Sequence, residues 1–139
     1  MRSRQPVTSR VLVTSASAVC ALALATAPGH AAAATSWNAT GTVADVVGAH
    51  AWGTISAGPS AGTYTVTANI KDTKADSHGA RVNLRAACDG SCVTLVSVSA
   101  SGLDEVRTGS FTLRAPITVQ ECLTEAGVDY ICAEPYTIS

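Results

Sequence analysis

Four cysteines in two closely spaced pairs constrain the fold of this 139-residue chain more than any other feature. Cys88 and Cys92 enclose three turn-forming residues. Cys122 and Cys132 enclose nine residues, so a hairpin turning at 126–127 would place these two cysteines opposite each other. Four cysteines allow three pairings, and this spacing favours Cys88 with Cys92 and Cys122 with Cys132. We therefore expect a small fold with two local disulfides.

A zinc site is the alternative use of four cysteines. The pairs have C-x3-C and C-x9-C spacing and are separated by 29 residues, whereas zinc knuckles usually pair their ligands as C-x2-C. An exported chain also meets oxidising conditions, in which disulfides persist. We therefore predict no metal ligands among these cysteines.

The N-terminal segment has the three parts of a secretory signal peptide. Positions 1–10 carry three arginines and no acidic residue, and residues 11–27 are almost wholly apolar or small. A Pro-Gly step and a run of small residues follow, with cleavage expected within 31–34. The sequence therefore predicts a cleaved signal peptide over 1–34 and a single exported β domain over 35–139.

The leader differs from a membrane anchor and from a lipoprotein signal. A membrane-spanning helix needs about 18 or more apolar residues, but Thr14, Ser15 and Ser17 interrupt this stretch. Cys20 follows Val19 inside the apolar region, where a lipoprotein signal would need a small residue. We expect Cys20 to leave with the leader and the mature domain to be secreted, with no membrane association.

The charge balance argues against nucleic acid as a partner. After cleavage the chain keeps six of its nine basic residues and all ten acidic ones, which gives a net charge of −4. No basic cluster is present to neutralise phosphates. The expected partners are an extracellular polymer, a cell-envelope component or another protein.

Alternating side chains predict an antiparallel β fold. In residues 63–72, Tyr64, Val66, Ala68 and Ile70 alternate with polar residues, which is typical of a strand with one buried face. Val82, Leu84 and Ala86 form a second such row. Further strands are expected at 93–99, 109–114, 117–122 and 128–133, and weaker ones at 41–47 and 52–55. Apolar residues slip in phase between Leu95 and Val96, as in a bulge or a two-sided strand.

Short strands separated by turn residues favour one class of architecture. Seven or eight of them indicate an all-β fold, a small antiparallel β-sandwich of immunoglobulin-like or jelly-roll topology. It would follow an N-terminal signal helix.

Two segments carry a family resemblance. The sequence YTVTANIKDTKADSHGARV over 64–82, with VQEC at 119–122 and YIC at 130–132, resembles small exported β-sandwich proteins of filamentous actinobacteria. The resemblance covers about two thirds of the mature chain and implies an exported β domain without a particular activity.

Size and cysteine number are also similar to neocarzinostatin-like apoproteins, which hold an enediyne chromophore. Their order of short and long disulfide loops differs from the order here.

The polar residues give no strong catalytic or metal motif. Asp72, Asp76 and His78 share a loop that could bind a cation, but their spacing misses the calcium-loop pattern, and such carboxylates commonly stabilise turns. His50 and His78 are the only histidines expected after cleavage, and no G-x-S-x-G elbow is present. We predict no catalytic residue, no cofactor and no metal ligand.

Two carboxylate pairs are possible acid–base groups of a glycosidase. Asp104 and Glu105 are adjacent, so their side chains would point to opposite faces of a strand, and a domain of this size has little room for a deep cleft. We interpret this pair as a solvated turn, and Glu121 with Glu125 as a hairpin rim.

Aromatic side chains are the candidate binding groups. Trp37 and Trp52 on one exposed face would form a binding surface, whereas Tyr64 is expected in the core, and Trp52 could instead close one end of the sandwich. The leading hypothesis is a non-enzymatic exported domain that binds through its surface. A carrier of a small hydrophobic ligand is the alternative, followed by a small secreted hydrolase.

Overall fold

The computed structural model describes residues 32–139, and all regular structure in this part is β. Most of the expected leader, residues 1–31, lies outside the described residues. The first strand begins at Thr35, where the mature domain is expected to start. The strands are β1 (Thr35–Asn38), β2 (Ala49–Ala57), β3 (Thr63–Asp72), β4 (Gly79–Ala87), β5 (Val93–Ala100), β6 (Val106–Glu125), β7 (Val128–Cys132) and β8 (Tyr136–Thr137).

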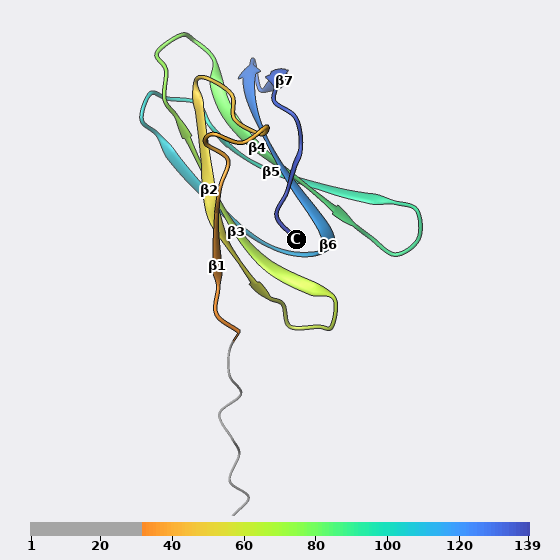
Figure 1. Ribbon diagram of the computed structural model, residues 1–139. Helices are drawn as coiled ribbons and strands as arrows, with labels where there is room; N and C mark the ends of the chain where they lie inside the picture. The colour runs from red at the N-terminus through yellow and green to blue at the C-terminus, as the bar shows by residue number, and fades with distance from the viewer. Residues whose placement is uncertain (1–31) are drawn as a thin grey trace, which may run out of the picture.

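The strands form one antiparallel sheet that folds over into two layers (Figure 1). The strand order is β1-β2-β3-β6-β4-β5, and β7 and β8 also pair with β6. Residues 106–114 of β6 pair with β3, and residues 114–124 pair with β4. The first layer therefore consists of β1, β2, β3 and the first part of β6, and the second layer consists of β4, β5, β7, β8 and the later part of β6. One long strand belongs to both layers. This arrangement confirms the expected all-β antiparallel class.

The continuity of β6 corrects the expectation of two separate strands at 109–114 and 117–122. The strand bends where Ala115 and Pro116 lie, and its register with β4 shifts there. Proline has no backbone N–H and cannot donate to a ladder. Pro116 therefore does not end a strand but marks the point where β6 passes from one layer to the other.

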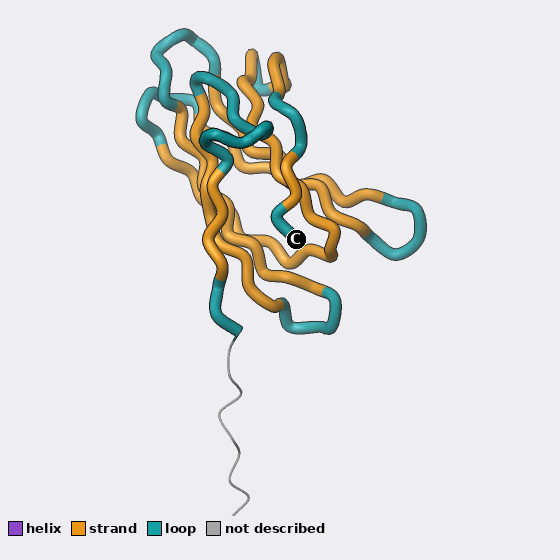
Figure 2. The backbone as a smooth tube through the Cα atoms, viewed as in Figure 1, coloured by secondary structure: helices purple, strands orange, loops and turns teal. Residues whose placement is uncertain are grey.

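The weak strand expected at 41–47 is wrong, because this segment forms turns between β1 and β2. The N–H of Thr42 donates to the carbonyl of Ala39 at 2.9 Å, and the N–H of Gly41 donates to Asp45 Oδ2 at 2.8 Å. Gly41 has φ of +77° and Gly48 has φ of +113°, a left-handed backbone that breaks an extended chain. Figure 2 shows such loops at the ends of the strands.

The core lies between the layers and follows the predicted alternation. Val66, Ala68 and Ile70 of β3 are fully buried, as are Val82 and Leu84 of β4. Tyr64 packs against this core as expected. Each fully buried valine, leucine or isoleucine side chain stabilises the fold by about 1.5–3 kcal/mol.

Strand β5 is two-sided and contains no bulge. All eight of its residues pair with β4 in regular register. Leu95 is 58% exposed on the outer side, whereas Val96 and Val98 pack against the core. The phase slip in the sequence therefore reflects apolar residues on both faces.

Glu121 corrects the expectation of a solvated hairpin rim. The residue faces the interior from β6 and its exposed fraction is 0%. Glu121 Oε2 accepts the N–H of Val46 at 2.9 Å, and Oε1 accepts the N–H of Ala51 at 2.6 Å. This carboxylate fastens both the turns before β2 and the beginning of β2 to the second layer.

Both expected disulfides are present. Cys88 pairs with Cys92, and Cys122 pairs with Cys132 across the β6–β7 hairpin. The hairpin turns at 126–127, where both residues have positive φ, as in a type I′ turn. Two disulfides are typical of an oxidising, extracellular environment. Within residues 32–139, no helix is long and apolar enough to cross a membrane.

Candidate functional site

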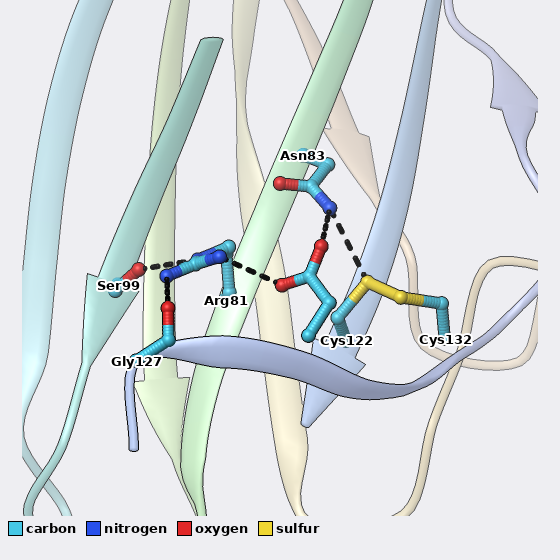
Figure 3. Close-up of polar contacts among 7 residues, drawn as sticks. Arg81, Asn83, Ser99, Cys122, Gly127 and Cys132 are labelled. Atoms are coloured by element: carbon cyan, nitrogen blue, oxygen red, sulfur yellow. Dashed lines mark hydrogen bonds and ion pairs between the residues drawn. A yellow bond between two sulfur atoms is a disulfide. The ribbon is translucent and has the colours of Figure 1, made fainter. Parts of the chain in front are cut away.

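A cluster of polar side chains lies on the outer side of the second layer and centres on Arg81 (Figure 3). Its guanidinium donates to Ser99 Oγ at 2.8 Å, to Asp129 Oδ1 at 2.8 Å and to the carbonyl of Gly127 at 2.7 Å. These partners lie on β5, on β7 and in the turn before β7. Arg81 therefore fastens the β6–β7 hairpin to the sheet.

Asn83 extends this cluster to the disulfide (Figure 3). Its amide nitrogen donates to Asp129 Oδ2 at 2.8 Å and lies 3.3 Å from Cys122 Sγ. Cys122, Asp129 and Cys132 place three ligand-type atoms within 4.8 Å of one another. The two sulfurs are bonded to each other, so they have no lone thiolate for a metal. The cluster is structural.

The loop with Asp72, Asp76 and His78 uses its carboxylates to form turns. Asp72 Oδ1 accepts the N–H of Lys74, and Asp76 Oδ1 accepts the N–H of His78, each at 3.1 Å. The hydrogen bond from His78 lowers the pKa of Asp76. These contacts match the turn interpretation of the sequence.

The two histidines lie in different surroundings. His78 Nδ1 lies 3.3 Å from Asp76 Oδ1 without hydrogen-bond alignment, and the ring stacks on Tyr130 with centroids 5.3 Å apart. His50 lies beside Trp52 with ring centroids 4.6 Å apart. The two rings are tilted by 32° relative to each other. Both residues lie on the outer side of β2.

The outer side of the first layer is an uncharged polar surface around Trp52. The residue is partly exposed, and its register partners are Asn38 on β1 and Asn69 on β3. A concavity of about 510 Å³ lies over these strands. Its lining holds no Asp, Glu, Lys or Arg; the polar groups around the indole are Ser36, Asn38, His50, Thr54, Thr67 and Asn69.

Trp37 lies beside the concavity but its side chain is buried, which corrects the expectation of two tryptophans on one exposed face. Its side chain is 8% exposed and packs in the core opposite Gly53. A Cβ on Gly53 would overlap the Thr67 carbonyl and lie 2.9 Å from the Trp37 ring. Gly53 therefore makes room for an indole inside the sandwich, and Trp52 alone faces out.

The two asparagines beside Trp52 have fixed amide orientations. Asn38 Oδ1 accepts the N–H of Thr40 at 2.9 Å. Asn69 Nδ2 donates to the carbonyl of Trp52 at 3.2 Å, and its Oδ1 accepts the hydroxyl of Thr108 at 2.6 Å. Backbone groups thus determine which end of each amide points away from the protein.

Hydroxyl side chains extend the same surface in rows of register partners that run across the strands. One row runs Ser36, Thr54, Thr67 and Ser110, and a second runs Ser56, Thr65 and Thr112. An ion pair joins Lys71 Nζ to Asp104 Oδ1 at 2.6 Å beside this surface, where Lys71 is the register partner of His50. A partly exposed aromatic ring, two amides and many hydroxyls can hold a flat, uncharged ligand by apolar contact and hydrogen bonds.

Sequence reasoning identified Trp52 as a candidate binding residue and named His50, but it did not place His50, Asn38 and Asn69 beside Trp52. Aligning the outward positions of β2 with those of β3 would have placed Asn69 beside Trp52, since Asn69 stands in the polar row of the clearest strand. Asn38 and His50 lie at the ends of segments with no clear pattern. Comparison with protein-family models, curated proteins and solved structures finds no match.

Proposed function

We propose that this protein is an exported, non-enzymatic domain that binds an uncharged polysaccharide on the outer side of its first layer. The observation that carries the proposal is the partly exposed Trp52, which is flanked in register by two asparagines and surrounded by hydroxyl groups. An indole face offers apolar contact to the C–H face of a sugar ring, and the polar groups match its hydroxyls.

Two features favour a polymer of neutral sugars. The concavity lies open across three strands, so a chain could extend beyond it in both directions. Its lining carries no formal charge, which gives no advantage to an acidic or basic ligand. The two disulfides suit a protein that works outside the cell.

The test is binding of the oxidised domain to a panel of insoluble neutral polysaccharides, followed by affinity electrophoresis with soluble fragments. We expect retention on at least one polymer. Trp52→Ala should weaken binding by about tenfold or more, which corresponds to about 1.4 kcal/mol. Tyr130→Ala is the matched control, because Tyr130 is 58% exposed on the hairpin of the other layer.

Fluorescence gives a second measurement at the same site. In Trp37→Phe, Trp52 is the remaining tryptophan and reports directly on the surface. We expect added polysaccharide to shift its emission to shorter wavelength and to protect it from acrylamide. Retention on no polymer, or equal binding by Trp52→Ala and the parent protein, would refute the proposal.

A further inference from the structure

We infer that the polysaccharide recognised by this surface carries N-acetyl groups, whose carbonyl oxygens accept hydrogen bonds from Asn38 and Asn69. The inference rests on the proposed function and names the sugar chemistry within it.

The amide N–H groups of Asn38 are its unoccupied hydrogen-bonding groups beside the concavity. Its Oδ1 already accepts the backbone N–H of Thr40 at 2.9 Å, which fixes the oxygen toward the protein. The amide nitrogen makes no hydrogen bond within residues 32–139, and the residue is exposed beside the concavity. Its two N–H groups are therefore available to an acceptor.

Asn69, on the opposite side of Trp52, also has an amide N–H group available to a ligand. One of its N–H groups donates to the carbonyl of Trp52, and its oxygen accepts the Thr108 hydroxyl. An amide nitrogen carries two hydrogens, so one N–H remains for a ligand. The backbone carbonyl of Trp52 prevents the amide from turning over without losing this hydrogen bond.

Together the asparagines place donors on both sides of an aromatic face. Asn38, Trp52 and Asn69 occupy register-paired positions on three neighbouring strands. Two strand spacings separate the asparagines by about 10 Å. A fitting ligand therefore has an apolar ring face in the centre and strong acceptors that project to either side.

A β-1,4-linked chain of N-acetylated sugars has this pattern. Successive units are turned over relative to each other, so their acetamido groups project alternately to the two sides of the chain. A chain lying along β2 would direct one carbonyl toward β1 and the next toward β3. A plain glucose polymer has hydroxyls at these positions. Because a hydroxyl both donates and accepts, outward N–H groups favour a hydroxyl less than they favour an acetamido carbonyl, which only accepts.

The experiment compares two ligands that differ only at the acetamido group. Isothermal titration calorimetry would use chitin and cellulose oligosaccharides of equal length with the full oxidised domain. We expect the chitin fragment to bind about tenfold more tightly. Asn38→Asp keeps the acceptor for Thr40 and removes the outward donors, so it should lower affinity for the chitin fragment by about tenfold and leave the cellulose fragment unchanged.

Two controls separate the possible outcomes. Ser97→Asp adds the same charge to the exposed outer side of β5, in the second layer and away from the concavity, and should change neither affinity. Equal binding of both fragments, lost in Trp52→Ala, would overturn the N-acetyl inference and leave the proposed function standing. An unchanged affinity of Asn38→Asp for the chitin fragment would also overturn it. Binding of neither fragment nor of any other polysaccharide would overturn both.

Discussion

Glu121 is an acidic residue whose side chain is fully buried in the core. Burial raises the pKa of its carboxyl above the ordinary 4.5, the N–H groups of Val46 and Ala51 oppose that rise, and the charge of Asp45 adds to it. The folded protein therefore binds this proton more tightly than the unfolded chain does. Its contribution to stability is fully present below pH 4.5 and is lost as pH rises through the higher folded value.

Replacing Glu121 with Gln tests this assignment. The amide keeps one acceptor and turns an N–H₂ toward a backbone N–H, so we expect the free energy of unfolding to fall by about 1–3 kcal/mol. The loss should be largest at low pH, because only the parent protein has the titrating group. Urea denaturation at several pH values measures the difference between the two proteins.

The difference in stability between the parent protein and Glu121→Gln separates Glu121 from carboxyl groups whose pKa is lowered in the folded state. Backbone hydrogen bonds lower the pKa of Asp76 and of Glu105, so their contributions are lost as pH falls. Both are present in the parent and the variant and cancel in the difference. Glu125→Gln on the exposed hairpin end is the control and should follow the parent curve. A pH-independent difference for Glu121→Gln would contradict the raised pKa.

At the scale of elements, regular alternation was the reliable signal. It predicted β3 and the inward row of β4, because one wet face and one buried face impose a period of two. Alternation could not predict the turns at 41–47, where valines lie in a segment with left-handed glycines. It also could not predict that β6 continues through Pro116, since that depends on a second layer taking over the pairing.

The candidate site was predictable only in part for a similar reason. Trp37 and Trp52 look alike in the sequence, and the difference between them is the face of the strand on which each lies. Trp37 opposes Gly53, where a missing side chain leaves space in the core, whereas Trp52 opposes Asn38 and Asn69. Strand register decides both outcomes, and register depends on partners distant in the chain.

The β6–β7 hairpin gives a prediction at this scale. Removing the Arg81 side chain leaves Asp129 Oδ1 and the Gly127 carbonyl without the donor they have in the parent protein, although Asn83 still donates to Asp129 Oδ2, so Arg81→Ala should loosen residues 126–132 while the disulfide stays closed. A loss of about 1.5–3 kcal/mol would speed amide hydrogen exchange there by roughly tenfold or more, as measured by mass spectrometry.

Arg85→Ala is the matched control for this variant. Arg85 lies on the same strand and the same outer side, and it makes no side-chain hydrogen bond or ion pair within residues 32–139. Exchange in the hairpin should match the parent protein. Equal exchange in Arg81→Ala and Arg85→Ala would show that the disulfide alone holds the hairpin.

For the whole molecule, we expect the two disulfides to contribute unequally to the free energy of unfolding. The loop-entropy estimate gives about 3 kcal/mol for closing the Cys122–Cys132 loop and about 2 kcal/mol for the shorter Cys88–Cys92 loop. Cys122 is also fully buried, whereas Cys92 is exposed at the end of the second layer. Replacing both cysteines of a pair with alanine should therefore lower the free energy of unfolding more for Cys122–Cys132.

Urea denaturation of the two double variants measures this order. The parent protein under the same oxidising conditions is the reference, and mass spectrometry confirms that the remaining disulfide is closed. A larger loss for the Cys88–Cys92 variant would mean that the β4–β5 turn, and not the hairpin, limits stability.

The position of β6 in the chain also sets the order in which the domain can form. A chain that emerges N-terminus first, from a ribosome or through a membrane pore, releases β1 to β5 before β6. At that stage β2 pairs with β3 and β4 pairs with β5, but no strand joins the two hairpins. Such distant pairing slows folding. The two layers can therefore join through backbone pairing only after β6 has been released.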